Sequence, residues 1–268
     1  MTQSTIPFPP SGTSVDPTEN TTLGILENRR TIRKFAEEPI DQATIDAIEQ
    51  AARQTATSES LSAWSVIRIK DPKQRALVAS ICGHERIARA PLLYIFLADQ
   101  HRNLRIAREK GVDTAGGVLE STHLFLQAYD DAVLAVHATE TAAESLGLGA
   151  VILGAISNGV PQLVEALHLP PHVFPVLGLA IGKPVKVPEL KPRPPIEFQY
   201  FDDVYPADEE TPDLVGALAD FDKEVHEYYV RRNPNNPLLG FTDYVAGLAT
   251  RRTPKKPFEE ARERGFVE

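Results

Sequence analysis

Four of six consecutive side chains near the start of the sequence are cationic. Residues 29–34 read RRTIRK, although the 268-residue chain has a formal net charge of −9. A second basic group, residues 191–193 with the sequence KPR, follows about 160 positions later. Arginine forks, lysine and hydroxyl groups are the donors that bind phosphate well. Together the two groups predict that the folded chain brings them to one phosphorylated ligand.

Spacing within the first group indicates which side chains could act together. In an extended segment, alternate side chains lie on the same face, so Arg29, Thr31 and Arg33 would share one face. Arg30 and Lys34 would lie on the other, where we expect Lys34 to be solvated. Either basic group taken alone could equally be a solvated surface patch, so the hypothesis of an anion site depends on the combination.

The composition restricts the class of protein. A pI near 5.4 argues against broad nucleic-acid binding, which needs an extended basic surface. No stretch is apolar for the ~18 residues that a membrane span requires, and residues 1–22 lack the pattern of a signal peptide. We therefore expect a cytoplasmic protein with a small-molecule partner and no role at a membrane or on nucleic acid.

The cysteine and histidine residues do not form the patterns typical of disulfides or metal sites. The single cysteine, Cys82, excludes an internal disulfide and a cysteine-based zinc site, and its apolar context predicts a buried structural thiol. The seven histidines show no HExxH or other ligand spacing. We expect no metal site.

Hydrophobic periodicity and turn residues predict the order helix, helix, strand, helix, strand, long helix, strand, helix, strand. The helices are expected near 21–29, 42–54, 72–82, 116–146 and 160–168, and the strands near 64–69, 91–98, 147–154 and 174–182. After a proline-rich stretch, further helices are expected near 212–231, 241–249 and 257–264. This order predicts an α+β fold with helices covering a small mixed sheet, after a disordered N-terminal extension over residues 1–21.

The order of several short segments resembles the nitroreductase family of flavoproteins, in particular the oxygen-insensitive NADPH nitroreductases and flavin reductase P. The resemblance is carried by segments 30–35, 38–40, 51–55, 64–67, 142–149, 190–193 and 227–229. It implies a nitroreductase-like fold with a small mixed, mostly antiparallel sheet flanked by helices. It also implies one FMN-binding domain over residues 22–268, in which 197–268 forms an excursion and the C-terminal helices, and an intertwined homodimer with FMN at the interface.

The same resemblance assigns residues to FMN. Arg29, Thr31, Lys191 and Arg193 would hold the phosphate, and Arg33 would reach the pyrimidine edge, where a guanidinium favours the reduced anion. The full set of expected FMN contacts is Arg29, Arg30, Thr31, Arg33, Thr57, Ser58, Leu61, His84, Leu153, Gly154, Ala155, Lys191 and Arg193.

Several positions depart from the family pattern or have ordinary explanations. Residues 57–61, with the sequence TSESL, match a serine-rich family loop beside the ring, although they could also be an ordinary polar loop. Glu59 replaces an uncharged residue in this serine-rich loop, so we expect it to face solvent. His84 replaces a glutamine that bonds the ring, and it could equally be a surface histidine. Asp131 also matches a family position, where we expect a helix-surface or interface carboxylate rather than a catalytic one.

The activity implied by the resemblance is a two-step exchange. NADPH would give hydride to N5 of FMN and leave, and a nitroaromatic, quinone or flavin acceptor would then take the electrons. Arg232 and Lys256 fall where relatives place cations for the NADPH 2′-phosphate, although both could be solvated surface charges. Alternatives are a flavin reductase that feeds a partner oxygenase, reductive dehalogenation, a non-catalytic FMN-binding or redox-sensing protein, or a chain without flavin. No protein residue is expected to act as a general acid.

Overall fold

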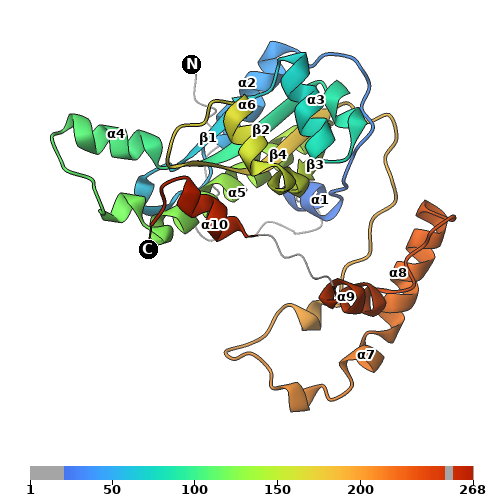
Figure 1. Cartoon of the computed structure of the whole chain (residues 1–268). Helices are drawn as coiled ribbons and strands as arrows, with labels where there is room; N and C mark the ends of the chain where they lie inside the picture. Colours follow the sequence, from blue (N-terminus) through green and yellow to red (C-terminus); the bar gives the residue numbers. More distant parts are fainter. Residues whose placement is uncertain (1–20, 251–255, 268) are drawn as a thin grey trace, which may run out of the picture. The chain divides into compact units, whose positions relative to one another are not determined.

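The computed structural model describes residues 21–250 and 256–267. The chain divides into two compact units, Met1–Pro188 with Pro257–Glu268, and Glu189–Lys256, and each unit is described by itself. The predicted disordered extension, residues 1–21, lies outside the described residues except for Thr21, which begins the first helix. Figure 1 shows the elements along the chain.

A four-stranded sheet forms the centre of the first unit. Its strands are β1 (Trp64–Arg68), β2 (Leu92–Asp99), β3 (Gly149–Leu153) and β4 (Val173–Gly182), in the spatial order β1-β2-β4-β3. All three pairings of these strands are antiparallel. The small, mostly antiparallel sheet implied by the family resemblance is therefore confirmed, and a parallel bridge between Thr31 and Ala150 lies at its β3 edge.

The buried strand β2 contributes to two cores because its side chains alternate between the faces of the sheet. On one face Leu93, Ile95 and Leu97 pack with residues of α3 (Pro72–Ile81) and α6 (Val160–Ala166). On the other face Leu92, Tyr94 and Phe96 pack with residues of α2 (Gln42–Ala52) and α5 (Thr122–Ser145). Helices on both faces explain why β2 reads as a continuous apolar run, and they confirm the expected α+β arrangement (Figure 1).

Helix α5 is the long buried helix that the sequence predicts, but it begins later than expected. Ser121 caps it by accepting a hydrogen bond from the Leu124 backbone N–H at 3.2 Å. Residues 116–120, assigned to the helix from their apolar content, instead contain Gly116 at positive φ and the 3₁₀ turn η4 (Val118–Glu120). Glycine there favours a turn over helix continuation.

One helix of the first unit was not predicted. Helix α4 (His101–Glu109) is short and predominantly polar and buries only Leu104, so it offers too few apolar residues for a helical repeat to be recognised. The remaining elements of this unit are α1 (Thr21–Glu27), the 3₁₀ turns η2 (Ser58–Ser60), η3 (Glu85–Arg89) and η5 (Gly154–Asn158), and α10 (Pro257–Glu263). Across residues 21–250 and 256–267, no helix has both the length and the apolar character needed to cross a membrane.

The second unit has a small core of its own. It contains the 3₁₀ turns η6 (Ile196–Phe198) and η7 (Asp208–Glu210) and the helices α7 (Leu214–Ala217), α8 (Ala219–Arg232) and α9 (Phe241–Ala249). Leu218, Phe221 and Val225 are buried together. The Asp222 carboxylate accepts from the Phe241 backbone N–H at 2.7 Å, which begins α9. The helices predicted near 212–231 and 241–249 are confirmed, the first divided into α7 and α8.

The C-terminal segment returns to the first unit, where Phe266 anchors it. Phe266 is fully buried and packs against Phe125 with ring centroids 4.7 Å apart. The Thr122 backbone N–H donates to the Val267 carbonyl at 2.7 Å, so the end of the chain is bonded to the start of α5. This anchor brings a segment far away in sequence against the central helix.

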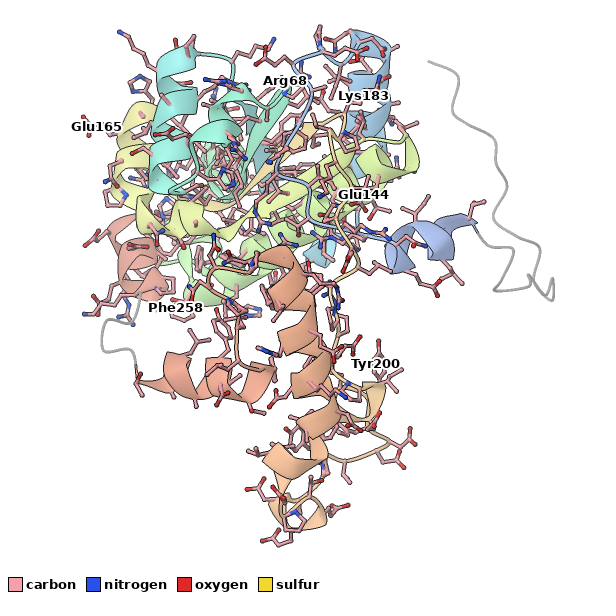
Figure 2. All side chains as sticks on the ribbon, turned by 90° about the vertical axis from the view of Figure 1, so that its right-hand side faces the viewer. Arg68, Glu144, Glu165, Lys183, Tyr200 and Phe258 are labelled. Carbon is pink, nitrogen blue, oxygen red and sulfur yellow. The ribbon has the colours of Figure 1, made fainter. Side chains whose placement is uncertain are left out.

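Replacement of the anchor should destabilise the first unit. Phe266→Ala removes a fully buried ring and leaves a cavity, so we expect the free energy of unfolding to fall by about 3–5 kcal/mol in urea titrations. Phe258→Ala is the matched control, because Phe258 (labelled in Figure 2) is 48% exposed on the neighbouring α10. An equal loss in both variants would contradict the anchoring role of Phe266.

Candidate functional site

The basic segment 29–34 lies extended beside β3, as its alternation predicts. The Ile32 backbone N–H donates to the Ala150 carbonyl at 2.8 Å, and the Val185 N–H donates to the Lys34 carbonyl at 3.1 Å. Ile32 is buried, and a Cβ at Gly149 would lie only 2.6 Å from its Cγ1. Glycine at 149 thus allows the segment to approach the sheet edge. Arg33 and Lys34 are exposed.

Arg29 is held by a buried carboxylate that the sequence analysis did not identify. Its Nε and Nη2 atoms donate to Glu140 Oε1 at 3.0 and 2.7 Å, and its Nη1 donates to Thr31 Oγ1 at 3.4 Å. The Glu140 side chain is only 1% exposed. These hydrogen bonds raise the pKa of Arg29 although burial opposes the shift. Arg29 and Thr31 are therefore on one side of the segment, as expected.

A second carboxylate, Glu144, lies one turn further along α5 (labelled in Figure 2). The Arg30 backbone N–H donates to it. Burial, and then repulsion by Glu140, raises the pKa of Glu144 to about 7, while Arg29 and Arg30 act in the opposite direction. The Arg30 Nε–H is buried and has no hydrogen-bond partner among the described residues.

Asp131 organises the serine-rich loop, and this corrects the expectation of a helix-surface carboxylate. It is 2% exposed. Its oxygens accept from Thr57 Oγ1 at 2.6 Å, from the Ser58 N–H at 2.9 Å and from the Ala63 N–H at 3.0 Å. The loop depends on these bonds because they hold both of its ends against α5.

The tip of this loop adopts an unusual backbone. Glu59, Ser60 and Ser62 have φ values of 50°, 58° and 45°, a left-handed region that is uncommon for residues other than glycine. Such strain is often found at functional sites, where the surrounding structure maintains it. Glu59 is exposed, as expected, and Leu61 is half-buried.

The segment expected beside the flavin N5 follows β3 directly. Leu153 is buried, whereas Gly154 is exposed and a Cβ built on it would have no neighbour within 4 Å. Ala155 follows in η5. His84 is half-buried after α3, where its backbone N–H donates to the Ala79 carbonyl at 2.9 Å.

Four predicted cations belong to the second unit. Lys191 Nζ lies 5.7 Å from the centre of the Tyr229 ring, and Arg193 Nη1 donates to the Lys191 carbonyl at 3.3 Å. Arg232 lies over the Tyr228 ring at 5.7 Å, and Lys256 is exposed. Because each unit is described by itself, convergence of these cations with segment 29–34 stays a prediction.

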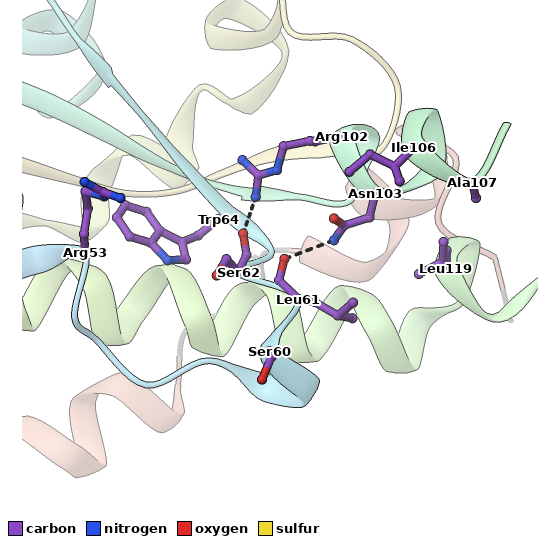
Figure 3. Close-up of a pocket in the computed structure, with 10 residues that line it drawn as sticks. All are labelled: Arg53, Ser60, Leu61, Ser62, Trp64, Arg102, Asn103, Ile106, Ala107 and Leu119. Carbon is purple, nitrogen blue, oxygen red and sulfur yellow. Dashed lines mark hydrogen bonds between the residues drawn. The ribbon is translucent and has the colours of Figure 1, made fainter. Parts of the chain in front are cut away.

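An open pocket of about 690 Å³ lies beside the serine-rich loop (Figure 3). Arg102 Nη2 donates to the Ser62 carbonyl, and Asn103 Nδ2 donates to the Leu61 carbonyl at 3.5 Å. Trp64 and Arg53 line the other end. The pocket therefore combines an aromatic surface with two guanidinium groups next to the strained loop.

Comparison with known proteins agrees with this fold. The Nitroreductase family matches residues 26–183, and the Nitroreductase family C-terminal domain matches residues 191–267. The oxygen-insensitive NADPH nitroreductase of Salmonella typhimurium is 38% identical over 84% of this chain and 89% of its own length. The FMN reductase (NADPH) of Bacillus subtilis is 29% identical over 92% and 98%, respectively.

Solved structures show the same architecture. The structure of B. megaterium NfrA1 superposes with a TM-score of 0.85 at 30% identity, covering 93% of this chain and 100% of that one. The chain belongs to the nitroreductase family, which confirms the resemblance inferred from its short segments.

The sequence carried a signal for Glu140 and Glu144, which were missed, as well as for Asp131, whose burial was not expected. Asp131, Glu140 and Glu144 are acidic residues in a predicted long apolar helix. Charged residues are rarely buried without partners, so their presence there indicates specific polar neighbours. Which loops supply those neighbours could not be derived from helix periodicity.

Loss of the Asp131 carboxylate should disorder the serine-rich loop. Asp131→Ala leaves several donors without partners, so we expect a loss of about 3 kcal/mol or more in the free energy of unfolding. Limited proteolysis should show faster cleavage within 57–63. The neighbouring exposed Asp130 provides the control Asp130→Asn, and the Asp131 anchor would be disproved if both variants resisted proteolysis equally.

The raised pKa of Glu144 should make stability depend on pH. An unfolded glutamate titrates near 4.3, so between about pH 4.5 and 7 the folded chain binds more protons and stability falls as pH rises. Glu144→Gln removes this penalty. We expect its free energy of unfolding at pH 8 to exceed that of the wild type by about 1 kcal/mol, allowing for partial solvent screening.

Urea unfolding at pH 5 and pH 8 measures this difference, which should be small at pH 5. Glu165→Gln serves as the control, because Glu165 is an exposed glutamate of α6 (Figure 2). A gain in Glu144→Gln that is the same at both pH values would be inconsistent with titration of Glu144.

Proposed function

We propose that this chain is an FMN-dependent oxidoreductase that takes electrons from NADPH and passes them to nitroaromatic, quinone or flavin acceptors. The observation that carries the proposal is the basic segment 29–34, which is bonded along the edge of β3 with its donors held in place. The names of the Salmonella nitroreductase and the Bacillus FMN reductase support the same chemistry.

The donors of the segment fit a phosphate group. The Arg30 Nε–H has no partner among the described residues although it is buried. Thr31 Oγ1 accepts from Arg29, so its own hydroxyl hydrogen can be donated to a ligand. At the phosphate the guanidinium groups of Arg29 and Arg30 face the carboxylates Glu140 and Glu144, and because the pKa of Glu144 is raised to about 7, a surplus of positive charge remains for a phosphate.

When bound, FMN supplies an electron-accepting centre at N5 that takes a hydride from NADPH and later gives up electrons to an acceptor. The chain positions the reactants. The open space beside Gly154 would admit a nicotinamide or an acceptor close to N5. A single opening beside Gly154 supports a ping-pong order, in which NADPH and the acceptor would approach the same face of the flavin in turn. Arg33, which is exposed, would face the electron-rich edge of the ring.

The geometry of α5 supports a site that two copies of the chain build together. Asp131 and Glu140 are nine positions apart on this helix, which is about 14 Å along the axis and half a turn around it. The serine-rich loop and the basic segment are therefore bound to opposite sides of α5. Thr57, Ser58 and Leu61 of one copy would complete the site of the other.

Exposed apolar side chains on the same helix favour this homodimer. Leu126 and Val133 lie seven positions apart on one face of α5 and are 44% and 36% exposed, and Leu134 beside them is 44% exposed. Lys191 and Arg193 would join the phosphate site, and Arg232 and Lys256 would bind the NADPH 2′-phosphate. The cytoplasmic location stays a prediction from the sequence.

Purification without added cofactor tests the proposal. We expect a yellow protein, or a colourless one that binds added FMN with a change in flavin absorbance. It should oxidise NADPH in the presence of a nitroaromatic or quinone acceptor, with parallel lines in double-reciprocal plots if the order is ping-pong. Comparison with NADH reports the nicotinamide preference.

Two outcomes would overturn the proposal in different ways. A protein that binds FMN but turns over none of the nitro, quinone and flavin acceptors would be a flavin-binding or redox-sensing protein. A protein that neither contains nor binds FMN would contradict the cofactor assignment itself. Turnover with free flavin alone would indicate a dedicated flavin reductase.

A further inference from the structure

We propose that Glu140 weakens the hold of this chain on the FMN phosphate, which makes FMN an exchangeable cofactor rather than a permanently held one. The inference rests on the proposed function, because it concerns the same phosphate site. Its basis is the position of a buried carboxylate directly behind one of the arginines that would bind the phosphate.

Glu140 compensates the charge of Arg29, and the Glu140 carboxylate is almost completely shielded from water. Its side chain is 1% exposed, whereas that of Arg29 is 24% exposed. Both hydrogen bonds from Arg29 end on the same oxygen, Oε1, at 3.0 and 2.7 Å. A phosphate that approaches the exposed side of Arg29 would therefore meet an ion pair rather than an isolated cation. Interactions between charges at such depth are screened much less than at the surface.

The other charged groups around Glu140 do not remove this effect. His137 Nδ1 lies 3.6 Å from Glu140 Oε2, but its side chain is 57% exposed. Glu144, one turn further along α5, adds negative charge whenever it is ionised. The phosphate would thus be bound by a segment whose positive charge is partly cancelled from behind by α5.

The hydrogen bonds make a charge-only substitution possible. Glutamine keeps one carbonyl oxygen, and a single oxygen accepts both bonds from Arg29. Glu140→Gln should therefore preserve the position of Arg29 while it removes the opposing charge. We expect the dissociation constant for FMN to fall on the order of ten-fold, with most of the change in the rate of FMN release.

Riboflavin, which lacks the phosphate, provides the internal control. Its affinity should be the same in the wild type and in Glu140→Gln, and the variant's FMN affinity should fall more steeply with salt. Glu49→Gln is the protein control for the loss of one ion-paired carboxylate elsewhere, because Glu49, 37% exposed, binds Arg68 at the β1 edge of the sheet. It should leave both flavin affinities unchanged.

Titration of the apo form of each full-length variant with FMN and riboflavin, followed by flavin fluorescence, measures these constants. Unchanged or weaker FMN binding in Glu140→Gln would overturn the inference, as would an equal gain for riboflavin or a similar gain in Glu49→Gln. These results leave the proposed function intact. A wild-type chain that binds no FMN would instead overturn the proposed function and the inference with it.

Discussion

Buried carboxylates on helix α5 hold the loops from which the candidate site is built. Asp131 bonds the serine-rich loop and Glu140 bonds Arg29 of the basic segment. Each carboxylate is almost fully removed from water, where an unpaired charge is strongly unfavourable. Each buried carboxylate is stable only when it accepts hydrogen bonds, and the loop groups that donate them are held in place by the same bonds. Helix α5 serves as core and as scaffold of the site at once.

The sheet determines where α5 can place these anchors. Helix α5 packs with α2 against the face that presents Leu92, Tyr94 and Phe96 of β2. The basic segment in turn joins the edge of β3 through Ile32, close to the C-terminal end of α5. The basic segment 29–34 is therefore held on two sides. Ile32 packs closely against Gly149, and Glu140 and Glu144 on the last turns of α5 bind Arg29 and Arg30. This rigidity suits a site that must orient a ring for hydride transfer.

The two halves of the site have different electrostatic characters. The basic segment carries excess positive charge, which Glu140 and Glu144 reduce from behind. The serine-rich loop offers hydroxyl and backbone groups on a strained backbone at 59–62, together with the aromatic pocket at Trp64. Such a division suits an elongated ligand with a charged end and a flat, polarisable end. It is consistent with the flavin chemistry proposed for this member of the family.

The sequence by itself determined the order of the elements apart from α4, and it favoured an extended conformation for 29–34, whereas the mostly antiparallel sheet was implied only by the family resemblance. The element order and the extended conformation follow from local periodicity, alternation and helix-capping residues, all of which act over a few residues. The sequence also pointed to the family, because each short segment is recognisable within a few residues and the order of the segments along the chain is read directly from the sequence. Helix α4 was missed because only Leu104 is buried on it. Only the tertiary structure decided that Asp131 and Glu140 are buried and which loops they bind. Those pairings join residues 74 and 111 positions apart, and no local pattern specifies a contact over such a separation.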